Sequence, residues 1–404
     1  MPVYNYKARD SYGKLARGAL DGISEEDVIK RLTTAGYMVT RVKQAPPRIA
    51  IEAAFERLKK VSVDEMVMFN IQLSNMIGAG ISIVDSLGAL SEQIANKRLK
   101  EVMGEVKRNI EAGDSFSKAL SRHPYVFPKI FISMVSVAEV SGKLDAILSR
   151  YAYFCEQQQE LRQKINGALF YPFILLLAGI AVTLYIVTFV IPQFAKIFIE
   201  AGIRLPAVTL IMYQVGNAIK QYWYLGFAFI LIIWAGLKLF ISSKRGRVYF
   251  DAFKLKVPIM GVLLSRVALS RLCRTLGTLL ASGVGILESL DIVRGVIGNE
   301  VISSVVYEAR DSVEAGRGIA ASLKNSEHFP PDMIQMVSAG ETTGRLSAML
   351  YKISDFYDTY IDRTVKKLTT IIEPLFLVIM GCIIGFIMAS LLLPMFDMVK
   401  LLRA

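Results

Sequence analysis

Hydrophobic positions form three long runs in this chain, and shorter periodic patterns lie between them. The runs cover about 171–191, 222–241 and 374–393. Each is close to the roughly 20 consecutive apolar residues that a helix needs to cross a bilayer. The pattern therefore predicts three transmembrane helices.

Between these runs, apolar residues recur every three or four positions, which is typical of helices with one buried face. The clearest examples are Met66, Phe69, Leu73, Leu269, Leu272 and Leu276. We expect about six helices in each of two domains, packed as bundles.

The first 60 residues follow a different pattern. VYNYKA and LARGAL alternate around a turn-like segment at 10–13, which predicts a hairpin. A helix begins after Ser24 and ends near Gly36, and a third strand is predicted over 37–42. We therefore expect a small α+β extension over 1–43, followed by a proline-containing linker over 44–60.

The chain contains an internal duplication with a spacing of about 203 residues. FNIQLSNMIGAGISIVDSL from Phe69 aligns with LCRTLGTLLASGVGILESL from Leu272, and MVSVAEVSGKLDAIL aligns with MVSAGETTGRLSAML. The match continues into the apolar runs, where the paired residues are Pro172 and Pro374, Gly179 and Gly381, and Pro192 and Pro394. The two copies share one orientation, so the unpaired middle run must return the chain across the membrane. This differs from the inverted repeats of many transporters.

Lys and Arg gather beside the runs on one side of the membrane, which predicts that both helical domains are cytoplasmic. The fold class is an all-α membrane protein with a small α+β N-terminal extension. The predicted order after the linker is a cytoplasmic domain over 61–170, a span over 171–191, an extracytoplasmic loop over 192–221, a span over 222–241, a cytoplasmic domain over 242–373, a span over 374–393 and an extracytoplasmic tail over 394–404.

Charge and composition narrow the possible functions. The chain has 47 Lys and Arg against 35 Asp and Glu, a net charge of +12, which suits an anionic membrane surface or acidic partners. No basic block occurs, so nucleic-acid binding is not predicted. Three cysteines without metal-type spacing, two histidines and no P-loop predict no cofactor and weaken an enzymatic assignment. A transporter is also disfavoured, because the spans are nearly free of charge.

One carboxylate in each copy is a candidate site residue. Glu139 precedes Gly142 and Lys143, and Glu341 precedes Gly344 and Arg345. Each glutamate could accept hydrogen bonds from nearby backbone amides or pair with the following basic residue. A contact with a partner or within the bundle also fits. Cation binding is less favoured, because one carboxylate per domain makes a poor metal site.

The apolar runs carry residues that shape helices and their packing. Pro172 and Pro374 are placed to kink the helices that enter the membrane. Gly381 and Gly385 form a G-x-x-x-G pattern, and Gly179 starts a matching small-residue pattern in the first run. Such faces permit close helix approach, so core packing and self-association are both open.

The repeated G-x-x-(I/L)-x-(D/E)-S-L pattern, which follows Ala79 in the first copy and Ser282 in the second, the G-E-x-x-G-x-L box and the membrane proline elements resemble one family over essentially the whole chain. It is the type II secretion system F family, the inner-membrane platform proteins of type IV pili and type II secretion systems. One departure is Ala138, which stands where the second copy has Gly340.

This resemblance implies a non-enzymatic protein of the bacterial inner membrane, with a cytoplasmic N-terminus and an extracytoplasmic C-terminus. Its implied partners are a hexameric assembly ATPase, pilins or pseudopilins, other inner-membrane assembly proteins and further copies of itself. The implied role is to couple ATPase motion to pilin extraction and polymerisation. Pilus assembly is favoured over type II secretion, and a small transporter is a distant alternative.

Overall fold

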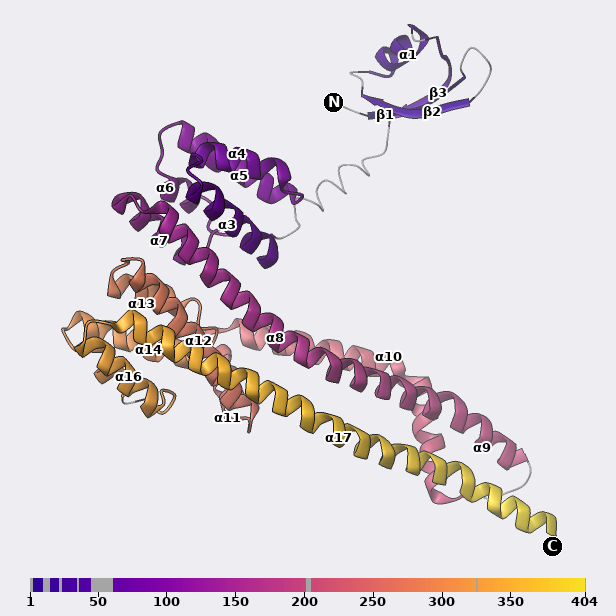
Figure 1. Cartoon of the computed structure of the whole chain (residues 1–404). Coiled ribbons are helices and arrows are strands. Elements are labelled where there is room, and N and C mark those ends of the chain that lie inside the picture. The colour runs from indigo at the N-terminus through magenta and orange to yellow at the C-terminus, as the bar shows by residue number, and fades with distance from the viewer. Residues whose placement is uncertain are drawn as a thin grey trace. The chain divides into compact units, whose positions relative to one another are not determined.

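The computed structural model describes residues 3–9, 15–21, 24–34, 36–44, 61–200, 205–324 and 326–403 (Figure 1). The chain divides into two compact units, 1–115 and 116–404. Each unit is described separately below.

The first unit begins with a three-stranded antiparallel sheet in the order β2-β1-β3. Its elements are β1 Val3–Arg9, β2 Leu15–Asp21, α1 Glu25–Thr34 and β3 Met38–Gln44. Val28 and Leu32 of α1 are buried with Val42 of β3, so one apolar face of the helix covers the sheet. The predicted strands and helix are confirmed. The turn at 10–13 and the linker after Gln44 lie outside the described residues.

Three further helices complete the first unit: α3 Val63–Gly78, α4 Ile83–Gln93 and α5 Lys97–Glu111. A reciprocal capping box starts α3, because the Ser62 hydroxyl accepts from the Glu65 amide and the Glu65 carboxylate accepts from the Ser62 amide. Gly80 ends the α3 turn at φ +83°, a conformation that costs glycine little.

The second unit is almost entirely helical (Figure 1). Its elements are α6 Phe116–Ser121, α7 Lys129–Ser141, α8 Leu144–Tyr185, the π-helical η1 Ile186–Val190, α9 Ile191–Glu200, α10 Ala207–Ser242, α11 Lys244–Lys256, α12 Met260–Ala281, α13 Ile286–Arg294, α14 Glu300–Glu314, α15 Ile319–Leu323, α16 Pro331–Thr342 and α17 Leu346–Arg403.

A buried apolar cluster joins helices of the two sequence copies within this unit. Leu263 and Val267 of α12 pack with Ile361 and Val365 of α17, and Leu161 of α8 completes the cluster. The long helix of the first copy therefore shares a core with the bundle of the second copy.

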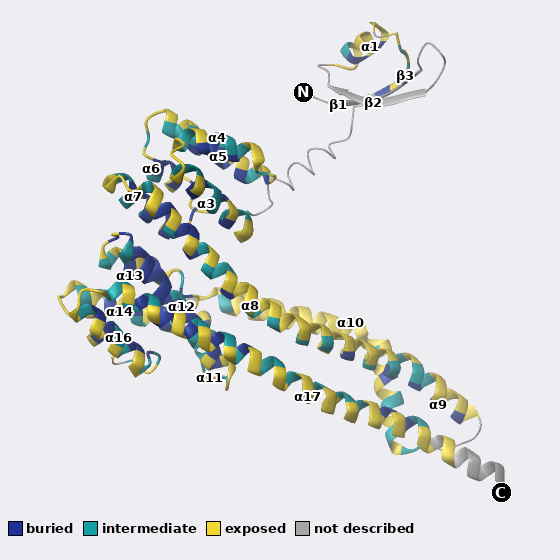
Figure 2. Cartoon of the chain, in the orientation of Figure 1, coloured by how far each residue is buried: buried dark blue, intermediate teal, exposed yellow. Residues whose placement is uncertain are grey.

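Three helical segments are long and apolar enough to cross a membrane: Leu144–Glu200, Ala207–Ser242 and Leu346–Leu393. They contain the three predicted spans. Exposed residues run along α10 and the outer parts of α8 and α17 (Figure 2), as expected for surfaces that contact lipid. The segment predicted as a loop over 192–221 is largely helical, because α9 and the first turns of α10 occupy its described part.

The helical backbone stays continuous through Pro172 and Pro374, and neither residue marks a break in its helix. Pro172 cannot donate to the carbonyl of Ala168. The Thr369 hydroxyl of α17, which donates to the Val365 carbonyl at 3.1 Å, also lies 3.5 Å from the Ala168 oxygen. The irregular positions lie elsewhere. They are the π-helical segment η1 and Tyr222, which interrupts α10 at φ −114° and ψ 16°.

Pro192 and Gly216 explain how η1 packs on α10. Ile191 donates its amide to Ile186 in the wide π pattern, but Pro192 has no amide hydrogen for the next such bond, to Val187. The backbone of α10 lies against this free carbonyl at Gly216, where any Cβ would overlap the oxygen. The pair thus makes a close contact between two of the long apolar helical segments.

Candidate functional site: a carboxylate-capped corner in each copy

The first corner joins α6, α7 and the start of α8. Glu139 lies in the last turn of α7, and its Oε1 accepts from the Phe116 amide at 2.5 Å. Its Oε2 accepts from the Ser117 amide at 3.1 Å and from the Ser117 hydroxyl. The first amides of a helix have no partner within it, and a negative charge is favourable at that end. Glu139 therefore caps α6 from a neighbouring helix.

The second corner repeats this geometry. Glu341 lies in the last turn of α16, and its two carboxylate oxygens accept from the amides of Ile319 at 2.5 Å and Ala320 at 3.1 Å. Gly318 is the cap residue of α15, and a Cβ there would lie 3.1 Å from Oε2 of Glu341. The missing side chain leaves room for the carboxylate.

The glycine of each box then turns the chain into the long helix. Gly142 has φ +68° and Gly344 has φ +65°, the left-handed conformation that ends many helices. The Lys143 amide returns to the carbonyl of Ala138, and the Arg345 amide returns to that of Gly340. Each box therefore builds a tight corner from which α8 or α17 starts.

Each glutamate accepts hydrogen bonds from backbone amides, which is one of the interactions that the sequence left open. The Lys143 and Arg345 side chains are exposed, and within the described residues neither forms an ion pair. No group of three or more His, Cys, Asp or Glu in the described ranges is arranged to hold a metal ion. A partner contact through the basic residues remains a prediction.

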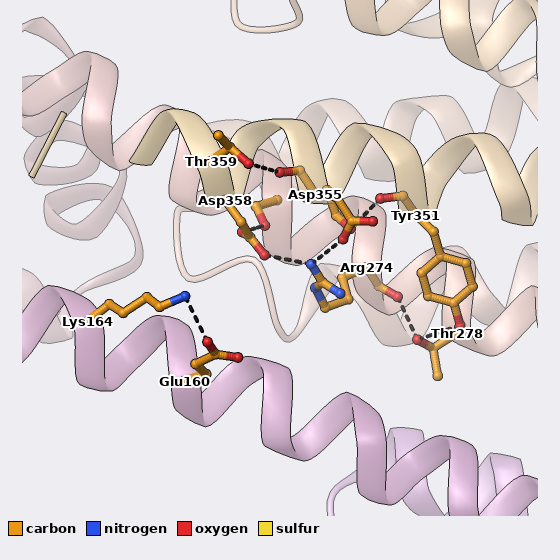
Figure 3. A network of polar contacts seen from close by, with 10 residues as sticks. Glu160, Lys164, Arg274, Thr278, Tyr351, Asp355, Asp358 and Thr359 are labelled. Atoms are coloured by element: carbon orange, nitrogen blue, oxygen red, sulfur yellow. Dashed lines mark hydrogen bonds and ion pairs between the residues drawn. The ribbon is translucent and has the colours of Figure 1, made fainter. Parts of the chain in front are cut away.

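The sequence patterns did not predict the polar network that joins α12 and α17 (Figure 3). The Arg274 side chain is 5% exposed and pairs with Asp355 at 2.9 Å and Asp358 at 2.6 Å. The Ser270 hydroxyl donates to Asp358, and the Tyr351 hydroxyl donates to Thr278. The available signal was the i, i+4, i+8 spacing of Ser270, Arg274 and Thr278, which places three polar residues on one face of the helix.

This network lies beside a cavity of about 260 Å³ that is also lined by α8. Glu160 and Lys164 of α8 form an ion pair of 2.8 Å on that side. The residue next to Arg274 is Cys273, whose thiol is fully buried, and burial raises its pKa. Charged groups thus line the junction of α8, α12 and α17.

Arg150 makes a second unpredicted contact between the copies. Its guanidinium donates from α8 to the carbonyl of Ala281, at the last turn of α12, and lies 3.5 Å from the Ser282 hydroxyl. A positive charge at this end of a helix complements the free carbonyls. The contact fixes the start of the first long helix on the second bundle.

The small residues of the spans separate into two groups. A Cβ at Gly179 would lie 2.9 Å from the Phe376 ring of α17, so Gly179 permits close packing of α8 on α17. Gly381 and Gly385 are exposed, and a Cβ at either position would meet no described atom within 4 Å. Pro394 lies in the helical backbone of α17.

These features define a class: a membrane protein built from two copies of a helical bundle joined to a transmembrane helix, with a third helix between them. The family model for type II secretion system protein F matches residues 69–192 and 272–394, and the model for its N-terminal domain matches residues 1–43. The chain belongs to the type II secretion system protein F family. The predicted family and duplication are confirmed.

Characterised relatives cover nearly the whole chain. It is 34% identical to the type IV pilus assembly protein PilC of Thermus thermophilus over 99% of this chain and 98% of that protein. It is 31% identical to PilC of Myxococcus xanthus, with 97% and 94% covered. It is 30% identical to the type II secretion system protein F of Xanthomonas campestris, with 98% and 99% covered.

Proposed function

We propose that this chain is a non-enzymatic platform protein of a type IV pilus assembly machine in the bacterial inner membrane. The observation that carries the proposal is full-length similarity to PilC proteins, at 34% and 31% identity. In this role the protein couples a hexameric cytoplasmic ATPase to the extraction and polymerisation of pilins, beside other inner-membrane assembly proteins and in a homo-oligomer.

The proposed topology places the N-terminus and both helical domains in the cytoplasm and the C-terminus outside. Its support is the concentration of Lys and Arg after the second span and before the third, compared with three such residues between the first two spans. The predicted domain boundaries are part of the same proposal.

The geometry of the corners suits a protein that transmits displacement. Each long helix starts at a capped corner and continues as one element into its apolar segment, and α17 runs without a break from Leu346 to Arg403. A tilt applied to a corner would therefore be carried along one helix to the membrane. The prolines act within these continuous helices as sites of local flexibility.

Exposed residues beside the corners are the proposed contact with the ATPase or another assembly protein. Lys143 and Arg345 follow the two turns, and Val140 at the first corner is 89% exposed. A basic side chain next to an apolar one fits an acidic partner surface with an apolar centre. Gly381 and Gly385 are proposed as a face for self-association.

A second candidate function is the platform of a type II secretion system. Its support is the 30% identity to protein F of Xanthomonas campestris over 98% of this chain. In that role the handled subunits would be pseudopilins, and the product would be protein export.

Deletion of the gene tests both candidates in one culture. Surface pili are counted by electron microscopy, and the proteins in the medium are quantified by mass spectrometry. Loss of pili with unchanged secreted proteins, restored by the intact gene, is the result expected for pilus assembly. Intact pili with a depleted medium would move the protein to type II secretion, and no change in either would contradict both roles.

A further inference from the structure

Helix α11 has an unusual exposed surface directly after the second span. It begins at Lys244, two residues after α10 ends at Ser242. Tyr249 is 71% exposed and Phe253 is 66% exposed, and their spacing of four residues places them on one face. The helix carries five basic residues and a single acidic one, Asp251.

The opposite face of α11 is fixed to the second bundle. Asp251 is buried, and its carboxylate accepts from the Glu300 amide at 3.0 Å, at the start of α14. Lys254 pairs with this carboxylate at 3.0 Å and lies over the Phe250 ring. The only acidic group of the helix is therefore used internally, and Tyr249 and Phe253 are held outward.

The corner after α11 extends this apolar surface. Ile259 is 57% exposed and has φ +64° and ψ −54°, a strained conformation for a β-branched residue. It is the one non-glycine residue with positive φ in the described part of the chain. The Met260 amide donates to the Pro258 carbonyl across this tight turn. Met260 and Val262 are also exposed.

We infer that α11 and the Ile259 corner form a membrane-surface anchor that binds the anionic leaflet at which the second span ends. Helices with an aromatic apolar face and basic flanks lie in the interface between water and acyl chains. Lys and Arg close to an anionic membrane surface strengthen the binding of such a helix. The chain itself places α11 there, because α10 delivers it to the edge of the bilayer with only Ser243 between the helices.

The anchor gives the second bundle a fixed orientation on the membrane. Asp251 of α11 accepts a hydrogen bond from the first residue of α14, and α11 also packs against α12. These contacts fix α11 relative to the bundle. A bundle held in this way would move together with the bilayer surface. The strained turn at Ile259 would keep the apolar side chain of this residue directed outward.

Spin-label depth measurements on the full-length protein in nanodiscs test the anchor. Phe253→Cys is labelled in a background with Cys155→Ser and Cys382→Ser, because the remaining Cys273 is buried. Val140→Cys is the matched control, since it lies before α8, about 40 Å along that helix from the apolar run at 1.5 Å per residue. Accessibility to oxygen is compared with accessibility to a water-soluble nickel chelate.

In bilayers containing phosphatidylglycerol, the label at position 253 should favour oxygen severalfold, whereas the label at 140 should favour the chelate. The preference at 253 should fall in pure phosphatidylcholine and in the variant Arg245→Gln, Arg247→Gln, Lys256→Gln. Chelate access at 253 equal to that at 140 would overturn the proposal, and so would equal readings in the two bilayers. Shielding from both reagents that increases with protein concentration would assign the surface to a second copy instead.

Discussion

The two corners show the same capping contacts in different surroundings. Glu139 and Glu341 each accept two successive helix amides, at 2.5 and 3.1 Å in both copies. The residue before the glutamate differs between the corners. It is Ala138 in the first corner, where it is buried, and Gly340 in the second, where it lies against α17. The capping carboxylate is therefore common to the repeated unit, while the packing around it is specific to each copy.

The polar junction differs more strongly between the copies. Arg274 of the second copy aligns with Ile71 of the first, and Asp355 aligns with Tyr153. The second copy thus has a buried arginine paired with two aspartates where the first has Ile71 and Tyr153, and Glu156 of the first copy aligns with Asp358. Buried charge pairs add little net stability, and we expect this one to act by favouring one packing of the helices. The comparison assigns a packing role to the shared corner and a role in fixing helix position to the unshared network.

Breaking the network should have the largest effect on stability. Arg274→Ala removes a buried side chain and leaves Asp358 without its cation, so we expect a loss of about 3 kcal/mol. The free energy of unfolding is obtained from thermal unfolding of the full-length protein, in a background that keeps Cys273 as the only thiol. A thiol-reactive dye reports when unfolding exposes this thiol. Arg274→Met combined with Asp358→Asn removes both charges and should cost less than half as much.

The matched control is Lys352→Ala, an exposed residue of the same helix α17. The free energy of unfolding of this variant should change by less than about 0.5 kcal/mol. If Arg274→Ala had no greater effect than Lys352→Ala, the network would not fix the helices.

Removing either corner carboxylate should have the next largest effect. Glu139→Ala and Glu341→Ala each leave two helix amides without an acceptor, and we expect a loss of about 2 kcal/mol in each copy. Hydrogen exchange at the first amides of α6 and α15 measures it locally. Faster exchange confined to one copy would show that the capping is not equivalent in the two corners.

Exchanging the residues before the glutamates should have the smallest effect. A Cβ at Gly340 would lie 3.0 Å from the Cα of Leu346 and 3.2 Å from the Cβ of Met349. Gly340→Ala should therefore cost about 1 kcal/mol despite its better helix propensity. Ala138→Gly should cost about 1 kcal/mol through helix propensity alone. A stabilised Gly340→Ala protein in the same unfolding assay would contradict the close contact.

The sequence predicted the features that depend on local patterns. Run length identified the spans, and periodicity identified the helices. These features follow from the chain within a few residues of each position, so one sequence is sufficient.

Features that depend on distant segments could not be predicted in the same way. The acceptor role of Glu139 needs α6 and α7 to be placed in space, and the pairing of Arg274 with Asp355 joins residues 81 positions apart. Gly216 of α10 lies against the Val187 carbonyl of the π segment, which is another contact between distant residues. Pro172 and Pro374 lie within continuous helices, and the kink expected at each stays a prediction.

The most direct test of the account concerns the basic residues beside the corners. Lys143→Glu combined with Arg345→Glu is introduced into the deletion strain, and Lys129→Glu combined with Lys352→Glu is the exposed control pair, with one residue in each copy. Surface pili are counted, and the melting temperature of each purified protein is measured. The account predicts loss of pili at an unchanged melting temperature for the corner pair and normal pili for the control. Normal pili in the corner variant would contradict it.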